Sequence, residues 1–331
     1  MIISRTPFRV SFVGGGTDLP SFYKQDEGRV VSCAINRYLY VVVKRQIGIV
    51  EHKYRINWSK VEFANEVDEI EHPIVREALR LLNIDFPIEI TTFAEVPSNT
   101  GLGSSSTFAV GLLHALHALT RNYVTKNQLA KQASQIEIDI IGRKIGRQDH
   151  YAASYGSLNV FRFTSDDNVI VEPVFASPKT IDQIENSTAL FYTNQKRDAS
   201  EILKAQDRSN GENRDTLIKM RDLCAPLRKI FTNNYTPELF GQIMHQNWEY
   251  KKSLTSDISN PAIDAFYKKG LDAGALGGKL LGAGGGGFIM LVMPSEKRND
   301  VITAMEPLYH MPMKMDFGGT RITYYDNVGD A

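Results

Sequence analysis

The 331-residue sequence has little cysteine, no excess of charge of either sign and no long apolar run. Its two cysteines, Cys33 and Cys224, lack the Cys-x-x-Cys or Cys/His spacing of a disulfide framework or a zinc site, so we expect two buried thiols. The 38 basic residues balance 38 acidic residues. Because no net field draws the chain onto nucleic acid or an anionic membrane, any anion-binding site must be local.

The sequence also lacks the signals of membrane insertion and export. Its longest apolar stretches, such as 38–43 and 288–294, are far shorter than the roughly 18 residues of a membrane-spanning helix. The first residues, 1–5, carry an early charge and begin no apolar run that ends in a small-residue cleavage site. These absences predict a cytoplasmic protein without a membrane or nucleic-acid partner, and they leave a homodimer open.

Three familiar nucleotide-site motifs are absent or out of context. The sequence contains no G-x-x-x-x-G-K-[ST], which excludes a P-loop NTPase. Residues 282–287 match G-x-G-x-x-G but run into a predicted strand instead of a helix, so a Rossmann dinucleotide site is not expected. The tripeptide 316–318 copies the metal-binding Asp-Phe-Gly of protein kinases without an H-R-D segment upstream, and we expect a turn there.

Strands and helices are predicted in runs and not in strict alternation, which indicates an α+β fold. Strand patterns occur at 6–13, 29–45, 87–96, 158–163, 169–175, 188–193, 288–293 and near 321–325. Helical patterns occur near 72–82, 107–119, 126–141, 200–207, 216–231, 237–254 and 261–273. A polar stretch, 176–186, separates two parts, so we predict one domain at 1–183 and a second at 184–331.

Glycine is concentrated in three segments, 14–16, 101–103 and 274–287. Such density is unfavourable unless the backbone adopts positive φ or approaches a ligand closely. The middle segment belongs to the stretch 97–106, which follows a predicted strand and opens a helix. Exposed N–H groups, the helix dipole and three serine hydroxyls make this stretch a candidate phosphate loop. A polar N-cap on a core helix is the alternative.

Taken in order, the segments 9–18, 97–106 and 281–287 resemble the three motifs of the GHMP kinases, which include galactokinase, homoserine kinase and mevalonate kinase. The resemblance implies an N-terminal domain like domain 2 of ribosomal protein S5, a ferredoxin-like C-terminal domain and an active site in the cleft between them. It also implies ATP and Mg²⁺ as cofactors and a small-molecule sugar or sugar phosphate as substrate. Within the family, 14–20 and 146–153 look most like the D-glycero-D-manno-heptose 7-phosphate kinases, which phosphorylate the anomeric hydroxyl to give the 1,7-bisphosphate.

The resemblance assigns roles to single residues. Ser105 and Glu137 would hold Mg²⁺, Asp149 would face the acceptor hydroxyl, and Arg9 would lie against the acceptor. The loop around the ATP phosphates would comprise Pro97, Thr100, Gly101, Leu102, Gly103, Ser104, Ser105 and Ser106. The substrate would contact Gly15, Gly16, Thr17, Asp18, Gly284 and Gly285.

A sugar that already carries a phosphate needs a basic pocket away from the ATP site, since Arg and Lys are the usual partners of anions. One candidate pair is Lys196 and Arg197, which follow the predicted strand 188–193. A second candidate group is Arg143, Lys144 and Arg147.

Other interpretations remain open from the sequence. Glu137 could be a partly exposed helix carboxylate, and Asp149 could form a salt bridge with Arg143 or Arg147. Glycine replaces the Glu-His of galactokinase in the first motif, which argues against galactose. A kinase for another sugar such as fucose, and a non-catalytic member that binds sugar and nucleotide, both stay as alternatives.

Overall fold

Two long neighbouring strands, β1 (Ile2–Val13) and β2 (Gly28–Arg45), organise the first sheet. The structure is a computed structural model that describes residues 1–47, 49–195 and 213–326. The sheet runs in the order β12-β1-β2-β5-β3-β4, while the first half of β2 also pairs with β6, which pairs with β7. The other strands are β3 (Tyr54–Asn57), β4 (Val61–Ala64), β5 (Ile88–Ala94), β6 (Leu158–Phe163), β7 (Val169–Pro173) and β12 (Arg321–Tyr325).

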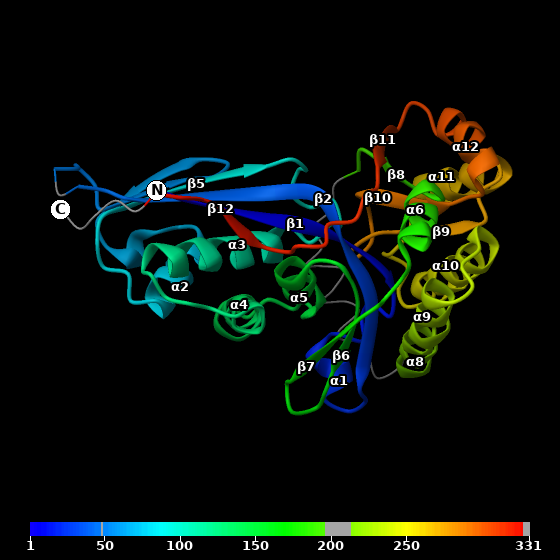
Figure 1. Cartoon of the computed structure of the whole chain (residues 1–331), viewed down its shortest axis with the longest axis horizontal. Coiled ribbons are helices and arrows are strands. Elements are labelled where there is room, and N and C mark those ends of the chain that lie inside the picture. Colours follow the sequence, from blue (N-terminus) through cyan, green and yellow to red (C-terminus); the bar gives the residue numbers. More distant parts are fainter. Residues whose placement is uncertain (48, 196–212, 327–331) are drawn as a thin grey trace.

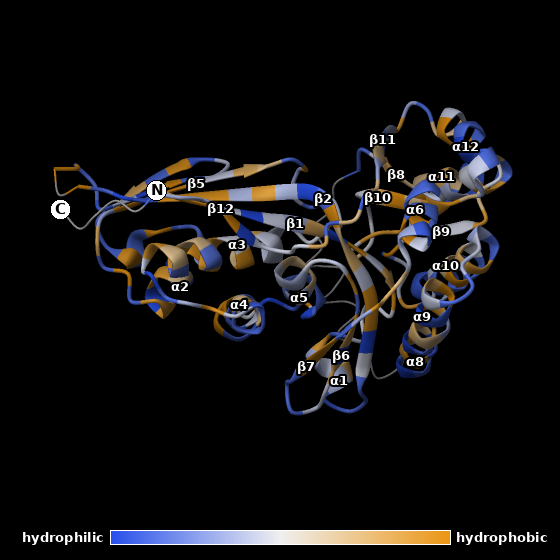
Figure 2. Cartoon of the chain, in the orientation of Figure 1, coloured by the Kyte–Doolittle hydropathy of each residue, from blue (hydrophilic) through white to orange (hydrophobic). Residues whose placement is uncertain are grey.

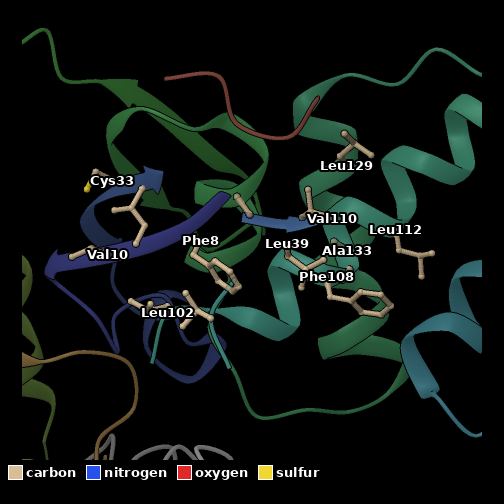
Figure 3. Packing of buried hydrophobic residues seen from close by; sticks show 14 of the residues in the cluster. Phe8, Val10, Cys33, Leu39, Leu102, Phe108, Val110, Leu112, Leu129 and Ala133 are labelled. Carbon is tan, nitrogen blue, oxygen red and sulfur yellow. The ribbon is translucent and has the colours of Figure 1, made fainter. Parts of the chain in front are cut away.

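Helices α2 to α5 cover one face of this sheet (Figure 1). In the resulting core, Phe8 of β1 and Leu39 of β2 lie near Val110 of α3 and Ala133 of α4 (Figure 3). The central helix α3 is apolar almost all round, as expected for a helix buried between a sheet and other helices. The helices of this lobe are α1 (Pro20–Tyr23), η1 (Val67–Glu69), α2 (Pro73–Leu81), α3 (Ser104–Leu119), α4 (Lys126–Ser134), the π-helical η2 (Gln135–Ile140) and α5 (Gln148–Tyr155).

The second lobe is an antiparallel sheet in the order β11-β8-β10-β9, packed against helices (Figure 1). Its strands are β8 (Thr188–Tyr192), β9 (Gly277–Leu280), β10 (Phe288–Val292) and β11 (Tyr309–Pro312). Its described helices are α6 (Pro178–Asn186), α8 (Arg214–Asp222), α9 (Cys224–Thr232), α10 (Pro237–Lys252), α11 (Pro261–Asp272), η3 (Ser295–Lys297) and α12 (Arg298–Ala304). In Figure 2 these helices mix hydrophilic and hydrophobic residues, whereas β10 is hydrophobic throughout, because the helices have one face in water and β10 is buried.

The predicted α+β class is confirmed, and several elements differ from the prediction. The polar stretch 176–186 contains α6, which begins where the Ser177 hydroxyl accepts a hydrogen bond from the Thr180 N–H. The single helix expected at 216–231 is two helices that meet at Leu223. Residues 148–155, for which no element was predicted, form α5, which places Asp149 in the first turn of a helix. The helix expected at 200–207 lies outside the described residues.

The chain returns to the first lobe after the second sheet is complete. Strand β12 pairs antiparallel with β1, with Ile2 opposite Tyr325 and Arg5 opposite Arg321. The first sheet therefore includes residues from both ends of the sequence. The domain division at residue 184 stays a prediction, and β12 lies after this boundary in the sequence but in the first lobe of the structure. Among the residues that the structure describes, no helix has the length and apolar character needed to cross a membrane.

Candidate active site

Residues from both lobes line one cavity. The first lobe contributes the end of β1, the glycine turn after it, the loop before α3, the η2 segment and the start of α5. The second lobe contributes residues from α8, α10, β9 and the glycine segment after β9. The lining residues that carry the argument below are Arg9, Ser11, Gly15, Asp18, Gly101, Gly103, Ser105, Glu137, Gln148, Asp149, Lys251 and Lys279.

The candidate phosphate loop is held against the third glycine segment. Gly101 and Gly103 have φ of +82° and +79°, a region in which glycine is favoured. A Cβ on Gly101 would lie 2.5 Å from the carbonyl oxygen of Leu281, so the two segments are in backbone contact. The Phe288 N–H also donates to the Thr100 carbonyl at 3.2 Å. These contacts fix the loop at the N-terminus of α3, where backbone N–H groups and the helix dipole favour an anion.

A hydrogen-bonded cluster joins the start of α3 to η2 and α5. The Ser105 hydroxyl and the Arg143 Nη1 both donate to Glu137 Oε1 at 2.5 Å. Arg143 Nη1 also donates to the Ser105 Oγ. On the other side, His150 Nε2 lies 2.9 Å from Glu137 Oε2, and neither of these two side chains is exposed. The exposed-carboxylate interpretation of Glu137 is therefore wrong.

The surroundings of Glu137 favour its charged form. Burial raises the pKa of Glu137, but the hydrogen bond and charge of His150, the Ser105 hydroxyl and the Arg143 charge outweigh burial and lower this pKa to about 2. A buried carboxylate that stays ionised beside a hydroxyl is suited to a hard cation. The Arg143 guanidinium contacts Ser105 Oγ and Glu137 Oε1, which shows that a positive charge is accommodated between them.

The oxygens of Ser105 and Glu137 fit a magnesium ion. Mg²⁺ prefers oxygen ligands and is usually bound by one or two carboxylates together with substrate phosphates. Within 1–47, 49–195 and 213–326, no group of three or more His, Cys, Asp or Glu side chains could hold a metal. The residues present therefore fit a metal that takes most of its ligands from a nucleotide and from water.

Arg9 fixes the carboxylate of Asp149 in the cavity. Arg9 Nε donates to Asp149 Oδ1 at 2.7 Å and Nη2 donates to Oδ2 at 2.6 Å, a bidentate pair. Arg9 Nη1 donates to the Gly101 carbonyl of the phosphate loop at 2.6 Å. A Cβ on Gly103 would lie 3.0 Å from Asp149 Oδ2, so the carboxylate stands beside the loop. The salt bridge expected with Arg143 or Arg147 is not formed, because those arginines pair with Glu137 and Asp167.

Asp18 lies deeper in the cavity. Its carboxylate accepts hydrogen bonds from the backbone N–H groups of Gly16 at 3.0 Å and Gln148 at 3.2 Å. Burial and the charge of Asp149 raise the pKa of Asp18, and these two hydrogen bonds oppose that rise. A Cβ on Gly146 would lie 1.8 Å from an oxygen of Asp18, which explains why glycine is needed there.

Two buried polar atoms near Asp18 lack a partner among the described residues. They are the Ser11 hydroxyl oxygen and the Gln148 amide oxygen. A Cβ on Gly15 would lie 3.8 Å from Ser11 Oγ and 3.7 Å from Gln148 Nε2, so the glycine leaves open space beside both side chains. Buried polar atoms normally have hydrogen-bond partners, and this corner suits the hydroxyl groups of a sugar.

Some predicted site residues do not line the cavity. Pro97, Thr100 and Leu102 shape the loop without facing the cavity, and Thr17 instead bonds the carbonyls of Gly14 and Arg29. Gly284 and Gly285 are buried, and the neighbouring positions 282 and 283 line the cavity in their place. A Cβ on Gly284 would lie 2.8 Å from the Ile258 Cα, so close packing accounts for this glycine. Lys196 and Arg197 lie outside the described residues.

Five residues that the structure brings to the site were not predicted from the sequence. They are Ser11, Gln148, His150, Lys251 and Lys279. Ser11 and Gln148 lie within the segments 9–18 and 146–153, so the unassigned positions of those segments could have suggested them. Lys251 lies on a helix without a recognised motif and Lys279 lies in the glycine segment 274–287, and only the fold shows that both are buried in the cavity wall.

Two family models match the chain. The GHMP kinases N terminal domain matches residues 53–157, and the GHMP kinases C terminal domain matches residues 234–309. The D-glycero-alpha-D-manno-heptose 7-phosphate kinase of Campylobacter jejuni is 28% identical over 92% of this chain and 93% of its own length. The bifunctional fucokinase/GDP-fucose pyrophosphorylase of Arabidopsis thaliana is 27% identical over 91% of this chain, which spans 30% of that larger protein.

Solved structures share the architecture. A D-glycero-D-manno-heptose 1-phosphate kinase from Bacteroides thetaiotaomicron superposes with a TM-score of 0.75 at 24% identity, over 98% of this chain and 100% of that one. Lactococcus lactis galactokinase in complex with galactose has a TM-score of 0.74 at 17% identity, over 97% and 94% of the two chains. The two-domain fold implied by the three motifs is thereby confirmed. The chain belongs to the GHMP kinases, a family of ATP-using small-molecule kinases.

Proposed function

We propose that the chain is an ATP- and magnesium-dependent sugar kinase that phosphorylates an anomeric hydroxyl, with D-glycero-D-manno-heptose 7-phosphate as acceptor. Membership of the kinase family and the heptose kinase relative support a sugar kinase. The observation that carries the catalytic part is the position of Asp149, which Arg9 holds beside the Gly103 turn of the phosphate loop. A candidate proton acceptor thus stands next to the candidate phosphate cradle.

The residues can be given distinct parts in the transfer. Backbone N–H groups of the loop and the N-terminus of α3 bind the phosphates of ATP. Asp149 orients the acceptor hydroxyl and receives its proton, while the guanidinium of Arg9 keeps the carboxylate in place. Asp18, Ser11 and Gln148 hold the other sugar hydroxyls. Most of the catalysis then comes from alignment and charge neutralisation, as is usual for phosphoryl transfer.

Ser105 and Glu137 would hold the magnesium ion, which neutralises phosphate charge when bound. Glu137→Gln keeps the shape of this side chain and removes its charge. We expect the magnesium concentration for half-maximal activity to rise at least tenfold in this variant, while the melting temperature reports on folding. An unchanged magnesium titration of a folded variant would assign Glu137 a purely structural role.

The heptose phosphate is favoured over fucose by the relatives. The heptose 7-phosphate kinase matches this chain over 93% of its own length, whereas the two fucokinases match over 30% and 34% of theirs. Fucose remains the second candidate, because those fucokinase relatives are of similar identity to this chain. The carboxylates of Glu137 and Asp149 in one cavity favour an enzyme over a non-catalytic binding protein.

A coupled assay of ADP release tests the proposal. The protein is supplied with ATP, Mg²⁺ and, in turn, D-glycero-D-manno-heptose 7-phosphate, the unphosphorylated heptose, L-fucose, galactose and mevalonate. We expect the largest kcat/KM for the heptose 7-phosphate, with product carrying a new phosphate at the anomeric carbon. A larger kcat/KM for fucose would replace the acceptor, and no turnover with any sugar would contradict a sugar kinase.

A further inference from the structure

Two buried lysines in the cavity wall take no part in the transfer described above. Lys251 lies near the end of α10 and is 6% exposed, and Lys279 lies in β9 and is 3% exposed. Lys251 Nζ donates to the carbonyls of Leu280 at 3.0 Å and Gly282 at 2.6 Å. Lys279 Nζ donates to the carbonyls of Ser11 and Phe12, each at 3.0 Å.

Neither lysine has a carboxylate partner. In the described parts of the chain, no carboxylate oxygen lies within 4.0 Å of either ammonium nitrogen, and the two hydrogen bonds of each go to neutral carbonyls. A protonated lysine has three donors, so in that form each of the two has one left for a ligand. Burying an ammonium without a counter-charge is unfavourable, and this fold buries two of them in one cavity.

The other charges of the cavity do not neutralise the two lysines. Arg9 and Arg143 are neutralised by Asp149 and Glu137. Burial first, then the charges of Lys279 and Arg9, lower the pKa of Lys251 well below its usual value. Burial and the charge of Arg9 outweigh the opposite effects of Cys224 and Asp18 and lower the pKa of Lys279 to about 7. The lysines thus lie in an electropositive region, and a bound anion would offset the repulsion between their charges.

Of the other cations predicted for a substrate phosphate, Lys196 and Arg197 lie outside the described residues, and the described ones are engaged or exposed. Arg143 is held by Glu137 and Ser105, and Arg147 pairs with Asp167. Lys144 is exposed and does not line the cavity. Among the cavity-lining residues that the structure describes, Lys251 and Lys279 are therefore the cations without an acidic partner.

We propose that Lys251 and Lys279 form an anion subsite on the second-lobe wall of the cavity and bind the phosphomonoester of a sugar phosphate acceptor. The inference rests on the proposed function, in that the cavity is taken to bind the acceptor. The reacting hydroxyl then faces Asp149 and the phosphate loop, while the phosphate end of the sugar reaches the second lobe. The subsite distinguishes a sugar phosphate from the free sugar.

Calorimetric binding of two probes tests this assignment. The probes are D-glycero-D-manno-heptose 7-phosphate and unphosphorylated D-glycero-D-manno-heptose, each titrated into the whole protein saturated with a nonhydrolysable ATP analogue. We expect Lys279→Met and Lys251→Met each to weaken the phosphorylated probe by about 10- to 100-fold, the size of one hydrogen bond to a charged group. The affinity for the unphosphorylated heptose should change no more than a few-fold.

The matched control is Lys252→Met, on the same helix. Lys252 pairs with Glu249 outside the cavity, and its loss should leave both probes unaffected. If a variant does not fold, a competition experiment on the unaltered protein still tests the subsite. With the ATP analogue bound, inorganic phosphate should compete with heptose 7-phosphate and not with unphosphorylated heptose.

The outcomes separate this inference from the proposed function. Equal losses for both probes, unchanged binding of heptose 7-phosphate, or an unaltered protein that does not prefer the phosphorylated probe would each overturn the subsite. If the lysine-dependent preference is present but ADP is not released, the subsite stands and the kinase proposal fails. If ADP is released with heptose 7-phosphate and the lysine variants bind it normally, the kinase proposal stands and the subsite fails.

Discussion

At the scale of single residues, the cavity separates paired charges from unpaired ones. The bidentate contact of Arg9 with Asp149 leaves the carboxylate little rotational freedom, with Arg9 itself anchored to the Gly101 carbonyl. Lys251 and Lys279 are instead bonded only to carbonyls among the described residues. The first arrangement is suited to orienting a reacting hydroxyl, and the second is suited to receiving an anion.

Replacing Asp149 with asparagine tests the proton acceptor. The side chain keeps its shape but loses its basicity, and a positioned general base typically contributes about 10²- to 10⁴-fold in rate. We expect Asp149→Asn to lower kcat by roughly that factor and to leave the affinities for sugar and nucleotide within a few-fold, because the loss falls on the transition state. The control is Asp167→Asn, which loses ion pairs to Lys24 and Arg147 outside the cavity. A folded, fully active Asp149→Asn enzyme would remove the proposed base.

The pKa of Lys279 makes a prediction about stability and pH. Burial and the Arg9 charge lower this pKa, against smaller opposite effects of Cys224 and Asp18, from 10.5 to about 7. Between these values the unfolded chain binds more protons than the folded one, so this group makes the folded state more stable as pH rises from 7 to 10.5. Below pH 7 both states are protonated, and the cost of burying the charge is fully present.

The variant Lys279→Met should remove that cost. We expect it to raise the free energy of unfolding by about 1 to 4 kcal/mol at pH 6. The loss of the two hydrogen bonds to carbonyls reduces this gain. Relative to the unaltered protein, this gain should shrink as the pH is raised to 9. Thermal melts of both proteins across this range measure the difference, and a gain that does not vary with pH would show that the Lys279 charge is not strained by burial.

At the scale of elements, the site lies where loops join helices and strands, at the end of β1, before α3 and at the start of α5. Strand β1 was predictable from its apolar pattern, and the loop before α3 from its glycines and serines. The start of α5 was not predictable by the same means, since Gly146 and Arg147 precede it without a capping side chain. Asp149 was therefore recognised through family resemblance, and its place in a helical first turn appears only in the folded chain. The pairing of β9 with β10, which brings Lys279 to the cavity, depends on contacts between distant segments.

Gly103 allows a test of the loop as an element. A β-branched residue at φ +79° would be strained, and its Cβ would lie 3.0 Å from Asp149 Oδ2. We expect Gly103→Val to weaken ATP binding more than tenfold by calorimetry. Gly142 is the matched control, because its φ is +78° and a Cβ at that position would meet nothing within 4 Å. Gly142→Val carries the same backbone strain and should bind ATP normally. Normal ATP binding by Gly103→Val would show that the loop does not hold the phosphates.

At the scale of the whole molecule, the two ends of the sequence share one sheet while the cavity lies between the lobes. β12 covers the edge of β1 that would otherwise be open (Figure 1). The strand pattern at 321–325 was predictable, but its partner was not, because sequence separation hides which strands pair. The return of the chain therefore joins the second lobe to the first at more than one point.

The side chain of Asp316 holds the segment that leads back into β12. One carboxylate oxygen accepts the N–H groups of Gly318 and Gly319, at 2.9 and 2.8 Å. The other accepts the Tyr38 hydroxyl and Arg321, both at 3.0 Å. The turn expected in place of a kinase metal site is confirmed, and Asp316 does not line the cavity. Its carboxylate thus joins β2 to the turn that leads into β12.

Removing this carboxylate should affect stability and spare catalysis. In Asp316→Ala four donors lose a buried carboxylate acceptor, although Arg321 is 44% exposed and can turn to water, and a hydrogen bond to a charged group is worth about 1.5 to 3 kcal/mol. We expect a clear fall in melting temperature, with kcat and the magnesium requirement unchanged at temperatures where the variant is folded. Asp300→Ala is the control, since its pair with Lys297 is exposed and such pairs contribute about 0 to 1 kcal/mol. A stable Asp316→Ala protein with an altered magnesium requirement would instead make the tripeptide part of a metal site.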